Sequence, residues 1–573
     1  MKCARTHLAL WCALAITSVS AANGPFLQTV DTQTWIIGNE VWNMTQKGTY
    51  GSPLWFQQRN CVGAAKGHYL SASGSGANFT WTSASIVANS TYNNVPFMDI
   101  SFTSPSGDMH WVIFSNQQGA YQYFVNRAVP PGEFRSLWRL DNSTFTRGHT
   151  ATRDAELPPL SSYLAENKVQ DETWLTPDGS GYITKYDFTS WIRAQRYYGV
   201  YGTGFGSWYI NPGKDYYNGN HLKQELTVHR ESATGDVVQL NMIHGTHFEL
   251  AVPDAAFTPA SAKMWGPWLW YINNGSLDDA AAKAEAEFAA WPYKWMQDDA
   301  YNARGSVSGK LVLSDGRSAA NAAVFLGDSN PTVSSLDQGI AYHYTAYADI
   351  DGVFTISSVR AGKYSLEAWS NGSTIADVNT RLLVNNFTVN AGQTTTLGNL
   401  AWAVSNKTRL FRVGDFDRTS VGFAHGAAPW QHALVDQCPT TVDFVVGQSK
   451  TSDWCFGQTY LGNWTVNFDI ASNATASSKN ATLIVSLAGY STGASSNIWA
   501  NGVQIGNLTS GTSQLLNDPS VYRSGTAAGE WRYFEFSFGS DVLKAGQRNS
   551  VVFELNKNAS WKGFMWDAVA LEW

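Results

Sequence analysis

Charged residues, cysteines and long hydrophobic runs are all scarce in this chain of 573 residues. Charged residues make up 14% of the sequence, and the net charge is −7. No overall basic field therefore exists to recruit nucleic acid or an anionic membrane, and we expect neither partner. The chain also lacks a HExxH zinc motif, a phosphate-binding P-loop and a G-x-S-x-G elbow, so the enzyme classes built on those motifs are not indicated.

The only sustained apolar run lies at the N-terminus and is too short to cross a bilayer. Lys2 and Arg5 form a basic start, residues 8–19 are apolar, and small residues at 18–22 resemble a cleavage site. This pattern predicts a signal peptide over residues 1–22 and a secreted, extracellular protein. Sequons such as the one at Asn142 fit a secreted glycoprotein.

The cysteines number five, and two of them fall inside the predicted signal peptide. Cys61, Cys438 and Cys455 remain in the mature chain. In an oxidising compartment we expect Cys438 and Cys455 to form a disulfide, with Cys61 left as a buried free thiol.

Aromatic residues are abundant by contrast, with 25 tryptophans. Short alternating or aromatic runs separated by Gly, Ser and Asn predict an all-β protein. We expect a large antiparallel β-sandwich at 23–300, a fibronectin-III-like sandwich at 301–402 and a carbohydrate-binding-module-like jelly roll at 403–573. One clear helix is predicted at 278–290, with acids in its first turn.

Three separate stretches place one lysine, two arginines and two histidines in aromatic, strand-like sequence. These are Lys185, the pair Arg135 and Arg139, and the pair His244 and His247. Such a set suits β-elimination on a uronic acid, in which a base removes the proton next to a carboxylate whose charge must be neutralised.

Arg135 and Arg139 are four residues apart, which puts both on one face of a strand. Their guanidinium groups could clamp a carboxylate. Placed beside Lys185, they would also lower its pKa by like-charge repulsion, and partial burial would act in the same direction. A histidine would supply a proton donor or a further polar contact. Each of these residues taken alone is more often solvated or structural.

The three stretches together resemble the rhamnogalacturonan lyases of polysaccharide lyase family 4. The residues G-E-F-R-S-L-W-R-L at 132–140 fit the family's G-E-L-R-x-x-x-R-L motif. I-T-K-Y at 183–186 fits its lysine strand, and G-T-H-F at 245–248 fits its histidine strand. The order of three domains is also similar, and the resemblance implies a galactose-mutarotase-like catalytic sandwich.

By this resemblance Lys185 abstracts the proton and His247 is its catalytic partner, while Arg135 and Arg139 bind the galacturonate carboxylate. His244 lies three residues from His247 and could exchange roles with it or contact substrate; we favour His247. The implied substrate is rhamnogalacturonan I, a pectic polysaccharide, cut at rhamnose–galacturonate bonds to leave a 4,5-unsaturated galacturonate.

Two other functions stay open at this stage. A glycoside hydrolase would need two carboxylates across the scissile bond, and Glu133, Asp187, Glu225 and Glu249 are candidates. A non-catalytic wall-binding protein would keep the tryptophans and need neither Lys185 nor a histidine.

No cofactor is required by the predicted chemistry, and we expect a monomer. Asp567, with Asp415 and Asp417, could contribute to a structural calcium site in the last domain, because hard carboxylate oxygens suit that ion. Turn and strand-end roles are the alternative for these three aspartates.

Overall fold

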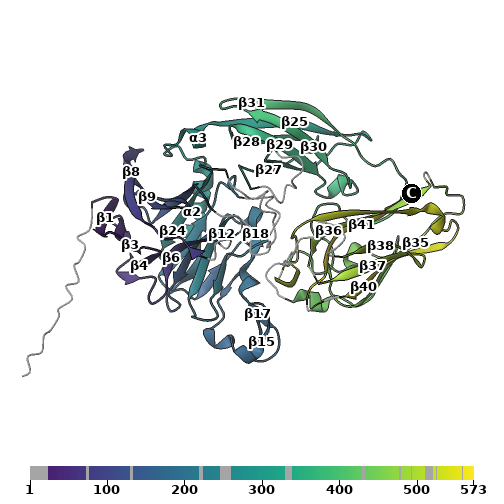
Figure 1. Ribbon diagram of the computed structural model, residues 1–573, viewed down its shortest axis with the longest axis horizontal. Helices are drawn as coiled ribbons and strands as arrows, with labels where there is room; N and C mark the ends of the chain where they lie inside the picture. Colours follow the sequence, from purple (N-terminus) through teal and green to yellow (C-terminus); the bar gives the residue numbers. More distant parts are fainter. Residues whose placement is uncertain are drawn as a thin grey trace, which may run out of the picture.

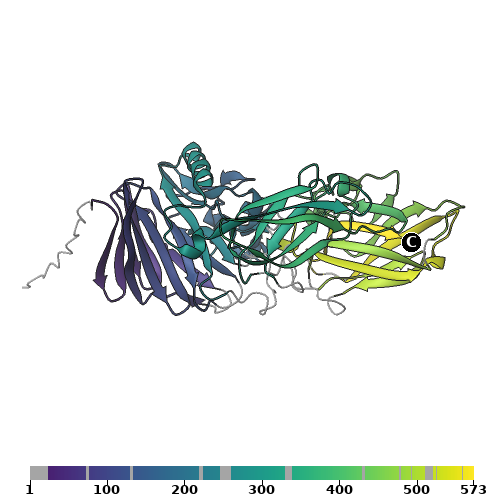
Figure 2. The same ribbon diagram turned by 90° about the horizontal axis from the view of Figure 1, so that it is seen from above.

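The computed structural model describes residues 23–72, 77–129, 133–217, 224–244, 260–329, 339–428, 433–476, 479–491, 493–509, 521–523, 525–557, 559 and 561–573. It is nearly all β, as the sequence predicts, and its strands form three successive groups of sheets. The first group lies at one end of the elongated molecule and the third at the other, with the second beside the junction between them (Figure 1). The view from above shows the same order along the long axis (Figure 2). The exact boundaries between these units stay predictions.

The first group is a sandwich of two large antiparallel sheets. One sheet has the order β1-β2-β3-β4-β6-β12-β23-β22, with β5 beside β4 and β7 beside β6. Its strands are β1 (Phe26–Asp31), β2 (Thr34–Gly38), β3 (Trp42–Lys47), β4 (Tyr50–Phe56), β5 (Arg59–Asn60), β6 (Gly67–Ala72), β7 (Ala77–Asn78), β12 (Phe134–Leu140), β22 (Val228–Arg230) and β23 (Val237–His244).

The second sheet has the order β14-β13-β19-β20-β24-β11-β10-β9-β8. Its strands are β8 (Ser83–Tyr92), β9 (Val95–Ser104), β10 (Gly107–Phe114), β11 (Gly119–Asn126), β13 (Arg147–His149), β14 (Asp154–Glu156), β19 (Tyr197–Gly202), β20 (Phe205–Ile210) and β24 (Met264–Asn273).

Tryptophans fill the space between these two sheets. Trp138 of β12 stacks on Trp270 of β24 with ring centroids 4.7 Å apart, and Trp42 meets Trp270 edge-on at 5.2 Å. Side chains alternate across a strand, so the neighbours of Trp138 on β12 point away from this core. Arg135, Leu137 and Arg139 therefore share the opposite face of β12.

That opposite face is covered by a second apolar layer around Leu137, Tyr186, Ile192, Tyr217 and Leu240. The covering segments are short 3-10 helices and two small sheets, in the orders β15-β16-β17 and β18-β21. They are η2 (Leu160–Ser162), η3 (Ala165–Asn167), β15 (Lys168–Gln170), β16 (Thr173–Leu175), β17 (Tyr182–Thr184), η4 (Lys185–Phe188), β18 (Ser190–Trp191), η5 (Ile192–Ala194) and β21 (Gln224–Glu225). A cover of loops over a rigid sheet face is a common setting for a functional site.

The predicted helix is α2 (Leu277–Ala290), within one residue of the expected start. The Ser276 hydroxyl caps it by accepting a hydrogen bond from the Asp279 amide at 3.2 Å. The buried Glu287 accepts hydrogen bonds from Tyr121 and Tyr293, which fixes the helix against β11 of the second sheet. A short helix, α3 (Asp299–Asn302), leads into the second unit. No helix among the described residues is long and apolar enough to cross a membrane.

The second group is a smaller sandwich of two sheets, in the orders β28-β25-β31 and β27-β26-β29-β30, enclosing a core of its own. Its elements are β25 (Arg304–Leu313), β26 (Ala323–Gly327), β27 (Tyr344–Tyr347), β28 (Val353–Arg360), β29 (Gly362–Trp369), η6 (Ser373–Ile375), β30 (Leu382–Val389) and β31 (Thr394–Trp402).

The third group has two five-stranded sheets around a separate core. One has the order β32-β41-β36-β39 with β34 beside β41, and the other has the order β33-β35-β40-β37-β38. The elements are β32 (Arg409–Gly414), η7 (Leu434–Gln437), β33 (Val442–Val445), η8 (Thr451–Asp453), β34 (Gly457–Gln458), β35 (Gly462–Asp469), β36 (Asn480–Tyr490), β37 (Ser495–Ala500), β38 (Val503–Leu508), η9 (Val521–Arg523), β39 (Arg532–Gly539), η10 (Ser540–Val542), β40 (Arg548–Lys557) and β41 (Phe564–Glu572).

Cys61, Cys438 and Cys455 are placed as the sequence predicts. Cys438 and Cys455 form a disulfide in the third unit, with their Cα atoms 5.6 Å apart. Cys61 is a free, buried thiol, and burial raises its pKa to about 12. A thiol in that state is protonated at neutral pH and is a poor nucleophile.

Candidate active site

Lys185 lies at the point where β17 ends, on the covered face of the first sandwich. The sequence suggests a strand here, whereas Lys185 is the first residue of the 3-10 turn η4. Thr184 caps this turn: its hydroxyl accepts from the Tyr186 amide at 3.3 Å, and its own amide donates to Asp187 at 3.3 Å. Because both ends of the cap are satisfied, the position of Lys185 on the turn is fixed.

The Lys185 side chain is half-buried, with Nζ 5.5 Å from the centre of the Tyr186 ring. Within the described residues Nζ makes no side-chain hydrogen bond or ion pair. Burial lowers the pKa of Lys185, and the charge of Arg523 acts in the same direction, while Glu172, Asp171 and Glu231 oppose the shift. An unbonded amine with a lowered pKa can accept a proton from a substrate.

Arg523 reaches this site from the third unit. Its Nη2 donates to Oδ2 of Asp171 at 2.7 Å, and its guanidinium carbon lies 5.5 Å from the centre of the Tyr186 ring. The Tyr186 hydroxyl donates to the same Asp171 oxygen at 3.1 Å. A cation from the C-terminal unit therefore stands beside the lysine of the first unit, which sequence reasoning missed because the two residues are far apart in the chain.

Further contacts hold the third unit against the lysine-bearing loop. The Thr526 amide donates to Oε1 of Gln224 at 2.8 Å. The Tyr182 ring meets Trp561 edge-on with centroids 5.1 Å apart, and the Tyr182 hydroxyl donates to Asp436 at 3.3 Å. Since Tyr182 begins the strand that ends just before Lys185, the third unit contacts both sides of the turn.

Arg135 and Arg139 share one face of β12, as their spacing predicts, but each already has an acidic partner. Nη1 of Arg135 contacts Oε1 of Glu133 at 2.5 Å. The Arg135 Nε is buried and has no hydrogen-bond partner within the described residues. A buried, unsatisfied N–H is costly, so this atom is suited to receive an anionic group of a ligand.

Arg139 is held more completely than Arg135. It donates to Oε2 of Glu231 at 2.9 Å and to the Tyr69 hydroxyl at 3.3 Å, and its Nη1 lies 3.5 Å from Oδ2 of Asp236. Glu231 also acts on the charge of Lys185, so one carboxylate links the arginine to the lysine. The two arginines predicted as equals thus differ in how free they are to bind a ligand.

His244 is turned into the core, away from the face that carries Arg135. A β-bulge between Phe134 and Arg135 makes His244 the direct partner of Phe134, whose side chain lies in the core between the two sheets. Opposite residues in an antiparallel pair project to the same side, and the His244 ring accordingly lies 6.4 Å from that of Trp265. This position is on the side of the sheet away from Arg135, and the predicted contact of His244 with substrate stays a prediction. His247 lies outside the described residues.

The aspartates proposed for calcium have protein partners in the structure, and the calcium site stays a prediction. Asp567 is buried; one carboxylate oxygen accepts from the Asp417 amide at 3.2 Å, and the other accepts from the Ser486 hydroxyl. Asp415 forms an ion pair with Arg412. Within the described residues no group of three or more His, Cys, Asp or Glu side chains is placed to hold a metal. Burial and the nearby charge of Asp417 raise the pKa of Asp567.

Comparison with known proteins decides the family. Residues 303–397 match the profile described as "Polysaccharide lyase family 4, domain II", and residues 409–571 match "Polysaccharide lyase family 4, domain III". A rhamnogalacturonate lyase of Dickeya dadantii is 32% identical over 490 residues, covering 81% of this chain and 78% of that protein. The chain belongs to polysaccharide lyase family 4.

More distant relatives agree with this assignment. A probable rhamnogalacturonate lyase B of Aspergillus niger is 26% identical over 453 residues, covering 66% of this chain and 62% of that protein. The rhamnogalacturonate lyase B of Emericella nidulans is also 26% identical, covering 71% of this chain and 68% of that protein. The predicted membership of polysaccharide lyase family 4 is thereby confirmed, and so is the expectation that the protein is an enzyme.

Proposed function

We propose that this lyase cleaves rhamnose–galacturonate bonds of rhamnogalacturonan I by β-elimination, with Lys185 as the base. The single observation that carries the mechanism is the half-buried amine of Lys185, which has no bonding partner among the described side chains and whose pKa is lowered by burial. The names of the relatives support the choice of substrate. The predicted signal peptide supports secretion, and we propose that the enzyme acts outside the cell as a monomer.

In this mechanism Lys185 Nζ takes the proton from C5 of the galacturonate, next to the carboxylate. The electron pair of that C–H bond forms the C4=C5 double bond as the C4–O bond to the next sugar breaks. The leaving oxygen takes up a proton, for which we propose His247 as donor. Water is not consumed, and the product carries a 4,5-unsaturated galacturonate at its new non-reducing end.

Proton removal from C5 places a second negative charge on the carboxylate, which must be balanced. The unsatisfied Nε of Arg135 supports that residue as the main carboxylate ligand. Arg139 is paired with Glu231 and close to Asp236, so it is better suited to neutralise these two carboxylates than to bind substrate. Arg523 adds a cation beside Lys185 and favours the neutral amine that the reaction needs.

The hydrolase alternative is weakened by where its candidate carboxylates lie. Glu133 is bonded to Arg135, Asp187 accepts the Thr184 amide, and Glu225 accepts the Met242 amide at 3.1 Å. All three are buried. Two carboxylates facing each other across a scissile bond are not found among these candidates, and Glu249 lies outside the described residues.

Product analysis in water enriched in oxygen-18 tests the proposal. β-Elimination predicts fragments without the heavy isotope at the cleaved bond and with one double bond per cut. Incorporation of oxygen-18 at each new end would establish a hydrolase instead. Failure to cut rhamnogalacturonan I at all would refute the substrate assignment.

A further inference from the structure

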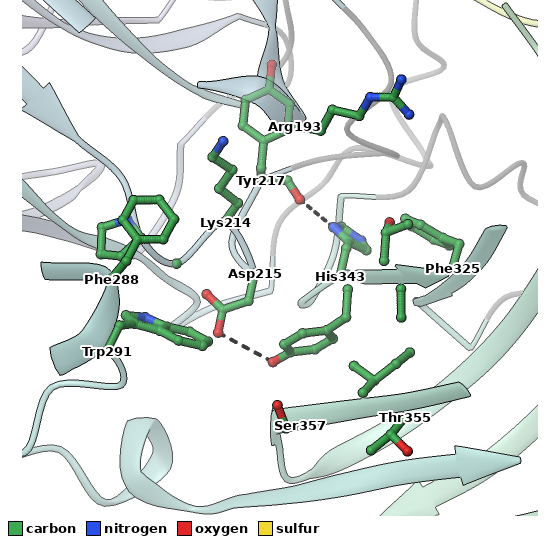
Figure 3. Close-up of a pocket in the computed structure, with 16 residues that line it drawn as sticks. Arg193, Lys214, Asp215, Tyr217, Phe288, Trp291, Phe325, His343, Thr355 and Ser357 are labelled. Atoms are coloured by element: carbon green, nitrogen blue, oxygen red, sulfur yellow. Dashed lines mark hydrogen bonds between the residues drawn. The ribbon is translucent and has the colours of Figure 1, made fainter. Parts of the chain in front are cut away.

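A cavity of about 360 Å³ lies between the first and second units, and Lys185 is not among the residues that line it. Phe288 and Trp291 form its wall on the first unit, and Phe325 and Thr355 lie on the second (Figure 3). Its volume falls within the usual range of small-molecule sites, and such sites are common between domains.

The wall chemistry suits a sugar. Trp291, Phe288 and Phe325 offer aromatic surfaces of the kind that pack against the apolar faces of pyranose rings. On the other side, Thr355 and Ser357 are exposed on alternate positions of β28, so their hydroxyls share one face of the strand. Aromatic faces combined with hydroxyl donors and acceptors match the mixed surface of a carbohydrate.

A buried carboxylate oxygen in the wall also lacks a partner. Oδ2 of Asp215 accepts hydrogen bonds from Arg304 and Arg360, both at 3.1 Å, and from Tyr344 at 3.4 Å. Oδ1 of Asp215 has no hydrogen-bond partner within the described residues, although the side chain is only 2% exposed. Asp215 is one of the residues that line the cavity, where a sugar hydroxyl could donate to this oxygen.

Positive charge nevertheless dominates around the cavity. Asp215 is offset by two guanidinium groups, and Lys214 and Arg193 also line the space. Lys214 Nζ donates to the carbonyls of Ile192 and Gln195, which uses two of its three N–H groups. Arg193 is exposed at the mouth, where Nη1 donates to the Tyr347 hydroxyl at 3.1 Å. The buried Glu225 offsets Lys214, whose pKa burial lowers to about 8. The surplus charge therefore lies on Arg193 and on the two guanidinium groups beside Asp215, and it favours an anionic sugar.

The cavity is joined to the candidate active site by a continuous segment. From Lys185 the chain runs through η4, β18 and η5 to Arg193 at the mouth. Arg193 lies over the Trp191 ring, with its guanidinium carbon 4.1 Å from the ring centre. Tyr217 both lines the cavity and belongs to the apolar layer that contains Tyr186.

We propose that this cavity is a distal subsite that holds a uronate unit of the polysaccharide away from the bond being cut. Arg193 binds the carboxylate, Asp215 accepts a ring hydroxyl, and the aromatic wall packs against the sugar face. This inference rests on the proposed function, because it assumes that the polymer crosses the Lys185 site. It explains why the second unit, none of whose described residues contacts Lys185, forms one wall of a cavity near the lysine site.

Two variants test the subsite without touching the residues of the proposed mechanism. Arg193→Ala removes the carboxylate ligand, and Thr355→Trp fills the cavity from an exposed strand position. Arg548→Ala is the matched control, since Arg548 is also an exposed arginine but pairs with Asp469 in the third unit, away from the cavity. Cleavage kinetics are measured on rhamnogalacturonan oligosaccharides of graded length, with melting temperature to confirm folding.

We expect KM for the longer oligosaccharides to rise roughly tenfold in both variants, the scale of losing one charge-assisted contact. Both variants should cut the shortest cleaved oligosaccharide as the wild type does, and the Arg548→Ala control should match the wild type at every length. Acidic oligogalacturonate should compete with long substrates, and neutral galacto-oligosaccharide should not. Unchanged KM at every length, an equal loss at every length, or competition by the neutral sugar alone would overturn the subsite.

Failure of the proposed function is distinguishable from failure of the subsite. If the wild-type enzyme produces no unsaturated uronate ends, the lyase mechanism is refuted, whatever the kinetics of the variants. In that case, calorimetry measures the binding of acidic oligosaccharide to the Lys185→Ala enzyme with and without Thr355→Trp. This tests binding at the cavity independently of catalysis. Equal binding by the two proteins would refute it.

Discussion

Arg523 of the C-terminal unit donates to Asp171 of the first unit at 2.7 Å, beside Lys185. Asp171 raises the pKa of Lys185 and Arg523 lowers it, so the ion pair balances the charge around the amine. The third unit thus contributes to the electrostatics of the lysine site in addition to any role in binding polysaccharide.

Arg523→Ala is predicted to move the pH dependence of kcat/KM to higher pH. The variant removes a cation that disfavours protonated Lys185 and leaves Asp171 unpaired, and both changes raise the pKa of the lysine. Because the base must be neutral, activity should rise at higher pH than in the wild type. Arg523→Lys should keep a profile close to wild type, and an unshifted profile in Arg523→Ala would contradict this role.

Glu231→Gln is predicted to shift the same profile in the opposite direction. Glu231 raises the pKa of Lys185, so its neutralisation should lower that pKa and bring activity to lower pH. The control is Glu166→Gln, an exposed residue of η3. A shift of Glu231→Gln to higher pH would show that its effect on Lys185 is misassigned.

Arg135→Gln and Arg139→Gln should separate substrate binding from structure. Arg135→Gln removes the unsatisfied donor, and we expect kcat/KM to fall by about 10- to 100-fold, with a smaller loss of stability because one carboxylate, Glu133, loses this partner rather than two. Arg139→Gln should also destabilise the fold by about 1–3 kcal/mol, because it leaves Glu231 and Asp236 without their partner. Kinetics and urea unfolding of both variants check this. Equal stability losses would contradict the distinction.

Removal of the Cys438–Cys455 disulfide should destabilise the third unit selectively. The bond closes a loop with a sequence separation of 17, for which the expected contribution is about 3 kcal/mol. In the double Cys→Ser variant, hydrogen exchange should accelerate in β33 and β35 and remain unchanged in β12. Uniform acceleration across all three units would show that they unfold as one.

His68 should make the first sandwich sensitive to acid. Burial lowers the pKa of His68 to about 3, so the folded protein keeps it neutral while the unfolded chain binds a proton below about pH 6.5. Stability is therefore lost as pH falls from about 6.5 towards about 3, by up to about 5 kcal/mol. His68→Gln should flatten this dependence in urea unfolding; the same slope in both proteins would rule His68 out.

Local sequence patterns predict the features that depend on local physics. Alternation places Arg135 and Arg139 on one face of β12, helix-favouring residues locate α2, and elimination among few cysteines identifies the disulfide. Local sequence patterns do not predict features that depend on long-range packing. The bulge that turns His244 into the core follows from pairing with β12, and Arg523 reaches Lys185 only because two units dock.

The acidic partners of the arginines show the same limit. The sequence suggests two free guanidinium groups that lower the pKa of Lys185. In the folded chain Glu231 and Asp236 surround Arg139, and Glu133 contacts Arg135. The shift at Lys185 comes first from burial, with Arg523 as the contributing cation. Which side chains neutralise one another is decided by the loops that close over the sheet.

The most direct test is the ultraviolet absorbance of conjugated unsaturated uronate, with wild type and Lys185→Ala run side by side on rhamnogalacturonan I and on polygalacturonan. We predict a steady rise for the wild type on rhamnogalacturonan I only, and no rise for the variant, which should still fold and bind the polymer. A Lys185→Ala enzyme that cuts as fast as the wild type, or cleavage that produces reducing ends without the absorbance, would contradict the account.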